Sequence, residues 1–245
     1  MASNALPDKR DRLFALGDDM CDGAHTHEVA IGLKQNTEAV VRPALEAAKA
    51  AESTFGACQV LRKTANAAHN TADNAAKVFI TNAKKRLSKF FGEAYTTEWG
   101  AAGWPNNSTA MPSTQAERFS LINSLKLHFT ANPAHESVDM EVTAALATTL
   151  HTTISNARTA LDQKVTESGQ AKAARDAAET NLRKRLRGMI TELETLLGAE
   201  DPLWHAFGLS RPADEETPEA PSFTTATPGG AGITHVDWDD ALRAD

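Results

Sequence analysis

The chain has 245 residues, of which 41% are hydrophobic, 23% charged and only 6% aromatic, and its formal net charge is −7. This length allows one or two domains, and the apolar share excludes a fully disordered chain. A single tyrosine and an excess of alanine argue against an aromatic-rich β-barrel or sandwich for most of the chain. No apolar run approaches the ~18 residues of a membrane span. Residues 1–10 lack the apolar stretch of a secretory signal, which predicts a cytoplasmic location.

The negative charge is concentrated at the C-terminal end. Residues 200–245 hold ten acids and two bases, whereas residues 1–199 hold 22 acids and 23 bases. A nearly neutral body gives little bulk attraction to nucleic acid, so we do not expect a nucleic-acid partner.

The first predicted element is a short amphipathic helix over residues 8–19. It is followed by a segment that is rich in potential metal ligands, among them Cys21, His25 and His27. One interpretation is a metal site or an enzyme active site built on these residues. The other is a solvated helix start with Asp22 or Thr26 as its N-cap. We favour the helix start, because His25 and His27 are two residues apart and do not share a helix face.

A first long helix is predicted from residue 27 to about residue 91. Steps of four and three residues from Leu33 define a seam without a charged residue, typical of a coiled coil with small side chains. The seam comprises Leu33, Thr37, Val40, Ala44, Ala47, Ala51, Thr54, Cys58, Leu61, Ala65, Ala68, Ala72, Ala75 and Phe79. Pro43 could kink this helix or divide it in two.

A loop over residues 92–114 and a helix over residues 115–130 follow. The helix has an apolar face of Phe119, Ile122, Leu125 and Phe129. The loop contains Trp99, Trp104 and Met111. These three side chains could form a recognition tip, since loops on a rigid scaffold often carry binding sites. They could equally plug the end of a bundle whose long helices are rich in alanine.

A second long helix is predicted over residues 137–198. Its seam comprises Val142, Leu146, Leu150, Ile154, Ala157, Leu161, Val165, Leu182, Leu186, Met189, Leu193 and Leu196. Because the two long stretches have similar lengths, we expect one antiparallel helical hairpin. Two basic clusters, at 84–89 and 183–187, could contact phosphate or an anionic lipid surface, or could be ordinary solvated helix surface, which we favour.

The composition changes at the C-terminal end. A final turn over residues 202–207 would bury Trp204 and Phe207, and residues 210–221 form a linker rich in proline and acids. Residues 222–227 and 233–238 alternate as two β-strands around a glycine-rich turn.

The segment 221–245 resembles the first two strands of a fibronectin type III module. The resemblance rests on residues 225–232, on Val236-Asp-Trp238 and on Asp240-Ala241, with Trp238 at the place of that family's core tryptophan. It implies a sandwich of some seven strands, of which this chain contains two. Either the sequence is part of a longer protein or these strands pair with another chain. The helical part is similar to uncharacterised bacterial alanine-rich helical proteins that precede such modules, and that similarity implies no activity.

These patterns predict a mainly α fold: a long antiparallel helical hairpin or coiled-coil bundle with short capping helices and a C-terminal β-hairpin. The expected domains are a helical rod (1–209), a linker (210–221) and a partial fibronectin type III-like hairpin (222–245). The sequence has no GxSxG, HExxH or phosphate-loop motif. We therefore predict a structural or protein-interaction module that has no enzyme activity, cofactor or small-molecule substrate. Its partner would be a protein or a further copy.

The residues that would carry such interactions fall in two groups. The distal loop would bind through Trp99, Trp104 and Met111, and the strands would assemble through Phe223, Ile233, Val236 and Trp238. Two other functions stay open: metal binding or catalysis at Cys21, His25 and His27, and weak binding of an anionic surface or nucleic acid by the basic clusters.

Overall fold

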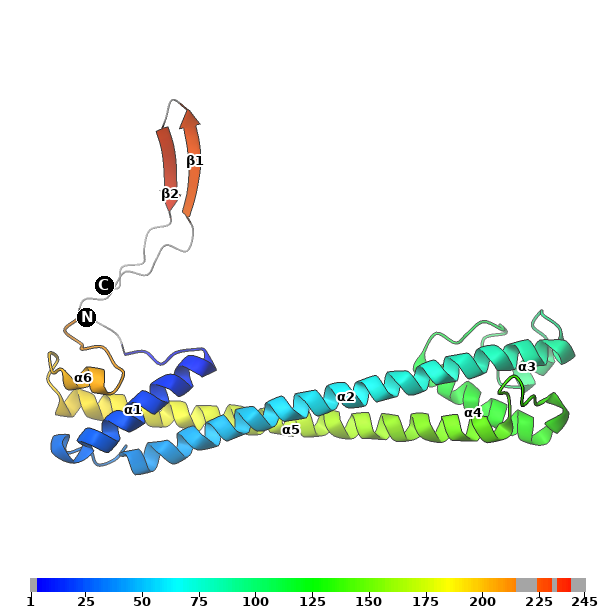
Figure 1. Cartoon of the computed structure of the whole chain (residues 1–245), viewed down its shortest axis with the longest axis horizontal. Helices are drawn as coiled ribbons and strands as arrows, with labels where there is room; N and C mark the ends of the chain where they lie inside the picture. Colours follow the sequence, from blue (N-terminus) through cyan, green and yellow to red (C-terminus); the bar gives the residue numbers. More distant parts are fainter. Residues whose placement is uncertain (1–3, 215–223, 231–232, 239–245) are drawn as a thin grey trace. The chain divides into compact units, whose positions relative to one another are not determined.

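The computed structural model describes residues 4–214, 224–230 and 233–238 and is mainly helical (Figure 1). The elements are α1 (Arg10–Ile31), α2 (Glu38–Phe91), α3 (Thr97–Ala101), α4 (Gln115–Ala131), the short 3-10 helix η1 (Pro133–His135), α5 (Ala144–Leu196), α6 (Leu203–Ala206), β1 (Thr224–Gly230) and β2 (Ile233–Trp238). The predicted mainly α class is confirmed. Among the described residues, no helix combines the length and the hydropathy that crossing a membrane requires.

The starts of both long helices differ from the prediction, and local backbone geometry explains why. Gly32 ends α1 in the left-handed conformation, at φ 80°, and its N–H donates to the Glu28 carbonyl. The chain then turns before α2 begins, so the predicted continuity from residue 27 is wrong. Pro43 lies inside α2 near its N-terminal end, and the helix continues through it. Ser137 and Val142 form an isolated β-bridge, which delays the start of α5 to Ala144.

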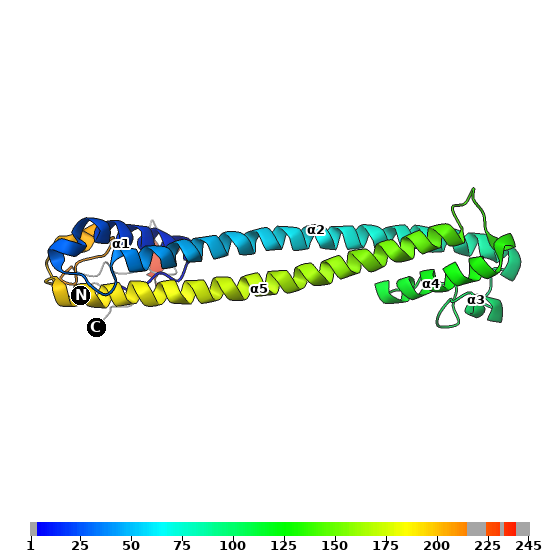
Figure 2. The same cartoon turned by 90° about the horizontal axis from the view of Figure 1, so that it is seen from below.

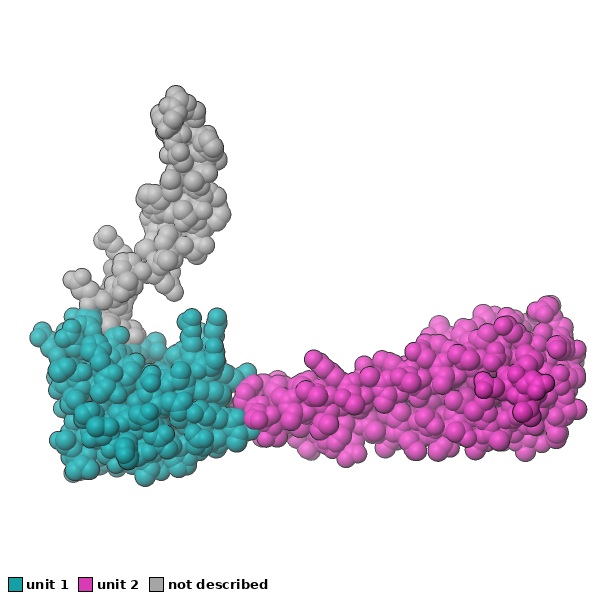
Figure 3. Space-filling model, viewed as in Figure 1, with its two compact units in different colours: residues 1–51, 176–245 teal, residues 52–175 magenta. Residues whose placement is uncertain are grey.

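The described helices belong to two compact units (Figure 3). Unit 1 comprises residues 1–51 and 176–245, and unit 2 comprises residues 52–175. In each unit a part of α2 lies beside a part of α5, running in the opposite direction (Figures 1 and 2). The predicted antiparallel pairing of the long helices is therefore present within each unit.

In unit 1, α1 and α6 complete the core that α2 and α5 begin. The largest fully buried side chains there are Leu13, Met20, Leu45, Trp204 and Phe207. The predicted burial of Trp204 and Phe207 is confirmed. At Gly23 a Cβ atom would lie 2.5 Å from the Ala206 carbonyl oxygen, so the contact between α1 and α6 requires glycine at that position.

Within unit 1, Glu192 of α5 holds the turn between α1 and α2. Its carboxylate accepts the backbone N–H groups of Lys34, Gln35 and Asn36 at 2.7, 3.0 and 2.9 Å. Burial opposes ionisation of this group, but these hydrogen bonds outweigh burial and lower the pKa of Glu192. Three backbone donors that a turn would otherwise expose thus gain a charged acceptor.

In unit 2, α4 packs on α2 and α5. Ile122, Leu125 and Phe129 of α4 are buried, as the predicted apolar face requires, and Phe119 is half-buried. A capping box starts α4: Thr114 Oγ1 accepts from the Glu117 N–H, and the Glu117 carboxylate accepts from the Thr114 N–H. Arg118 then forms a buried pair with Asp73 of α2, at 2.8 and 2.7 Å.

The predicted seam of the first long helix is only partly buried. Ala72 and Phe79 lie in the core, but Thr54, Ala68 and Ala75 are exposed, and Leu61 is 49% exposed. On α5, Val165 and Leu196 are likewise exposed, whereas the rest of the predicted seam is buried or half-buried. Some contacts with α5 are made by polar residues beside the predicted seam. Gln59, for example, donates to the buried Ser168 at 3.1 Å.

β1 and β2 form a two-stranded antiparallel sheet in which Thr224 pairs with Trp238 and Thr227 with His235. Ile233, Val236 and Trp238, which we predict to mediate assembly, lie on β2. Phe223 lies outside the described residues, as do residues 215–221 of the predicted linker.

Candidate interaction surface

The two tryptophans of the predicted loop are core residues of unit 2, and Trp99 lies on α3, so the prediction of a loop throughout residues 92–114 is wrong. Trp99 is 0% and Trp104 3% exposed, and their rings meet edge to face at 4.8 Å. Trp99 Nε1 donates to the Gly92 carbonyl at 3.2 Å, which ties the loop to the end of α2. Of the predicted tip residues only Met111 is exposed, at 38%. The geometry therefore supports the plug interpretation, and neither indole offers a surface to a partner.

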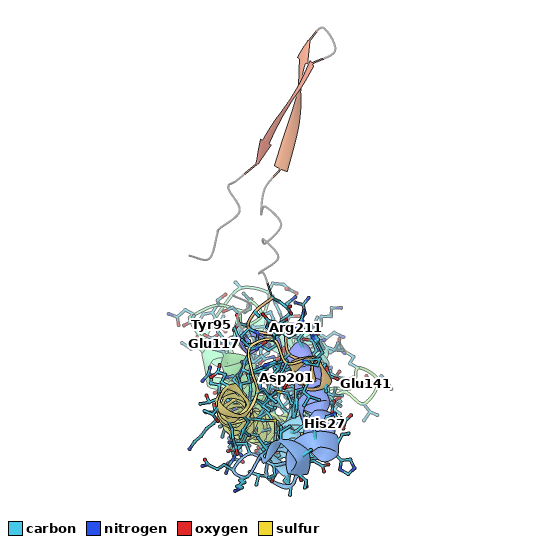
Figure 4. The ribbon with its side chains drawn as sticks, turned by 90° about the vertical axis from the view of Figure 1, so that its left-hand side faces the viewer. His27, Tyr95, Glu117, Glu141, Asp201 and Arg211 are labelled. Atoms are coloured by element: carbon cyan, nitrogen blue, oxygen red, sulfur yellow. The ribbon has the colours of Figure 1, made fainter. Side chains whose placement is uncertain are left out.

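The segment from Asp18 to Glu28 lies inside α1, so a helix start at Asp22 or Thr26 is wrong. Cys21 is fully buried, and burial raises the pKa of its thiol to about 11. Nδ1 of the exposed His25 donates a hydrogen bond to the Glu38 carboxylate, 2.8 Å away. His27, labelled in Figure 4, lies near the Phe207 ring instead. The helix thus directs these three side chains to different surroundings.

The neighbouring acids are already engaged. Asp18 pairs with Lys49 at 2.7 Å, and Asp22 pairs with Arg42 at 2.8 Å. Within the described part of the chain, no three histidine, cysteine or acidic side chains are grouped so that they could hold a metal ion. The geometry therefore gives the metal or enzyme interpretation of this segment no support.

A histidine pair that the sequence analysis missed lies at the end of unit 2. His128 Nε2 and His135 Nδ1 are 3.0 Å apart, and Phe91 meets both rings edge-on. They line an open hollow of about 530 Å³, together with Glu98, Ser124 and Asn132. Burial, and the proximity of His135, lower the pKa of His128. Two histidines seven residues apart, on a helix and in the following turn, give no sequence signal because the turn alone brings them together.

The basic clusters are partly used within the fold. Arg86 donates to the carbonyls of Ala134 and His135 and stacks over the Phe90 ring. Arg183 pairs with Glu179 at 2.9 Å. Lys85 and Lys89 of the first cluster are exposed. These contacts agree with the ordinary helix surface that we favour for both clusters.

The most unusual surface of unit 2 is one face of α2, which we name the neutral face. It carries no charged residue over about eight helical turns, although every one of its side chains is exposed. Its residues are Ser53, Thr54, Ala57, Val60, Leu61, Thr64, Ala67, Ala68, Thr71, Asn74, Ala75, Val78 and Thr81. A solvent-facing helix surface normally carries charged residues. Val60 and Val78 are 62% and 59% exposed.

Three threonine hydroxyls of the neutral face bond to the helix that carries them. Thr64, Thr71 and Thr81 donate to the carbonyls four residues earlier, at 3.2, 3.0 and 2.8 Å. A hydroxyl that is satisfied in this way can be covered by another molecule without leaving a buried donor unpaired. Threonine on this face therefore behaves more like a small apolar residue than like a polar one.

An apolar groove borders the neutral face between α2 and α5. It has a volume of about 350 Å³. Its walls are Ala75, Val78, Phe79 and Asn82 of α2, Leu146 and Leu150 of α5, and Glu141, which is labelled in Figure 4. The groove extends the exposed apolar surface from α2 onto α5.

Comparison with known proteins gives no relative on which to base a function. No family model matches the chain, and neither the curated proteins nor the solved structures show significant similarity to it.

Proposed function

We propose that the chain is a protein-interaction module and that the neutral face of α2 is its contact surface. One observation carries this proposal: the thirteen exposed residues that make up this one face of α2 include no charge, whereas Arg62 and Lys63 lie off the face. A helix face that stays in water gains solubility from charged residues, whereas charge is depleted at the centre of protein interfaces. Because Trp99 and Trp104 are buried, we assign the contact surface to this face of α2 and not to those two side chains.

The chemistry of the neutral face selects the kind of partner. Its side chains are alanine, serine, threonine, asparagine and a few aliphatics, so a second helix can approach closely. Lys63 and Lys77 lie beside the face and leave its centre neutral. The best-fitting partner is therefore an uncharged helix face with small side chains.

Native complexes of the tagged full chain test this proposal. The wild-type chain should elute in a complex larger than the monomer after gentle extraction from the cells that produce it. Thr64→Glu combined with Ala67→Glu should reduce that complex at least ~10-fold, because it buries charge in the interface. Asn66→Glu with Asn70→Glu, on the same helix outside the neutral face, is the matched control. A wild-type chain that elutes only as a monomer would overturn the proposal.

The strand pair is a second candidate for assembly. A two-stranded sheet is marginal in water, and both of its edges offer unpaired backbone groups. We therefore propose that β1 and β2 add to strands of another chain. Deleting residues 221–245 should reduce the mass of the assembly in light scattering. An unchanged mass for a native oligomer would contradict this role of the strands.

A further inference from the structure

The centre line of the neutral face belongs to a longer regular pattern on α2. Positions spaced alternately by four and three residues, which we name the central stripe, are Glu46, Ala50, Ser53, Ala57, Val60, Thr64, Ala67, Thr71, Asn74, Val78, Thr81 and Lys85. All twelve side chains are exposed. The ten inner residues are uncharged, the first is an acid and the last is a base. This alternation is the spacing of an antiparallel or parallel coiled-coil seam.

The central stripe is complementary to itself when its direction is reversed. In an antiparallel pair of identical helices, the residue numbers of opposed positions have a constant sum, here 131. Val60 then faces Thr71, and Thr64 faces Ala67 beside the two-fold axis. At both ends, Glu46 of one copy faces Lys85 of the other. We propose that the partner of the neutral face is a second copy of this chain, bound antiparallel through α2 in this register; this inference rests on the function proposed above.

The two charged ends specify the register. A shift by one heptad would place Glu46 opposite Val78 or Gly92, so both terminal ion pairs would be lost. Glu46 is available for such a pair, since its side chain is 61% exposed and its contact with Lys49 measures 3.6 Å. Lys49 would approach Lys84 of the second copy, but Asp18 holds the Lys49 ammonium at 2.7 and 3.0 Å.

The inner residues of the central stripe suit a close antiparallel contact. Large and small side chains alternate across it, because each valine meets a serine or a threonine: Val60 meets Thr71, and Val78 meets Ser53. The exposed valines lose contact with water, and the hydroxyls of Thr64, Thr71 and Thr81 keep their bonds to backbone carbonyls. A two-fold pair of this kind is closed, so the α2 contact by itself gives a dimer and no larger polymer.

A charge-swap experiment on the purified full chain tests the partner and the register together. Sedimentation equilibrium should show a wild-type dimer. Glu46→Lys places a lysine opposite Lys85 at both ends, and Lys85→Glu places a glutamate opposite Glu46. Each single variant should weaken the dimer at least ~10-fold, and the double variant should restore it to within ~3-fold of the wild type. Arg158→Glu, an exposed reversal on α5, is the control and should leave dimerisation unchanged.

Spin-label distances test the direction of pairing independently. In a Cys58→Ser background, nitroxides at Thr81→Cys in the two copies should be ~45 Å apart, because residue 81 faces residue 50 and each residue rises 1.5 Å. Labels at Ala67→Cys should be less than ~20 Å apart by the same geometry. Short distances at both positions would mean parallel pairing and would overturn the proposed register.

The two proposals can fail separately. A monomeric purified chain would overturn the second-copy inference, whereas a native complex sensitive to Thr64→Glu with Ala67→Glu would still support the neutral face as a contact surface for a different protein. A dimer that the double charge swap does not restore would also contradict the antiparallel register. Circular dichroism of each variant establishes that the exposed substitutions leave the helices intact.

Discussion

The two units treat the same pair of helices differently. In unit 1, α1 and α6 cover α2 and α5, and the charged residues of α2 pair with residues of α1: Lys49 with Asp18, and Arg42 with Asp22. In unit 2, α4 covers part of the helix pair, and the neutral face of α2 carries no charge although its residues are exposed. Charged residues of α2 are therefore engaged by a neighbouring helix in unit 1, whereas unit 2 leaves an uncharged face of the same helix exposed.

The largest difference in the free energy of unfolding should be between substitutions in the core and substitutions on the neutral face. Trp204→Ala in unit 1 and Phe129→Ala in unit 2 should each lower the free energy of unfolding by about 3–5 kcal/mol, because both side chains are fully buried. Val60→Ala should change it by less than ~0.5 kcal/mol under conditions where the chain is monomeric, since that side chain is 62% exposed. Urea denaturation followed by circular dichroism measures all three. A cost above ~1 kcal/mol for Val60→Ala would mean that the face is covered within one chain.

The second largest difference should be between the ion pairs of the two units, measured as the loss in the free energy of unfolding when one partner is removed. Arg118→Met in unit 2 leaves the buried Asp73 with only Lys77, so we expect a loss of about 3 kcal/mol. Arg42→Met in unit 1 should cost less than ~1 kcal/mol, because the Arg42–Asp22 pair is more exposed. Equal costs in the same denaturation experiment would contradict this contrast.

The Arg118–Asp73 pair should also affect how the free energy of unfolding depends on pH in acid. Burial opposes ionisation of Asp73, but the hydrogen bonds from Arg118 and Lys77 outweigh burial and lower its pKa. The stabilisation is present above the ordinary pKa of an aspartate and is lost as the pH falls below it. Arg118→Met should therefore reduce the fall in stability below about pH 4. If the stability of the variant falls as steeply below about pH 4 as that of the wild type, Asp73 is not the source of this fall.

The α1–α2 turn of unit 1 should respond more weakly. Glu192→Gln keeps the shape of the side chain but removes the charge that accepts three backbone N–H groups, so about 1–2 kcal/mol should be lost. Glu194→Gln, an exposed neighbour on α5, is the control. Hydrogen exchange should be faster at residues 34–36 in the first variant only. Unchanged exchange there would show that the carboxylate does not hold the turn.

The smallest effect should come from the histidine pair of unit 2. Because the pKa of His128 is lowered in the folded chain, the unfolded chain binds the proton first as the pH falls through the ordinary value of 6.5. Stability should fall there by less than ~1.4 kcal/mol per pH unit. His128→Gln should reduce this slope without removing it, since the pKa of His151 is lowered as well. Thermal melts between pH 5 and 7.5 measure the slope, and a variant with the wild-type slope would exclude His128 as its source.

The sequence predicted individual elements better than it predicted their boundaries. The apolar face of α4 and the burial of Trp204 follow from local spacing and are present. The break at Gly32 was missed, because a single glycine in the sequence does not show that it will adopt a positive φ. The metal-ligand segment was placed at a helix start, whereas α1 continues through it and separates its side chains.

The sequence by itself determined that the chain is mainly helical and that α2 carries a long seam without charge, because helical periodicity is a local property of the chain. Only the tertiary structure decided which side of that seam touches α5. A heptad pattern shows which positions of a helix are able to pack. It does not show how many other helices are present to cover those positions. The same limit applies to Trp99 and Trp104: an indole between two long helices can fill a core or face a partner, and three-dimensional packing alone distinguishes the two.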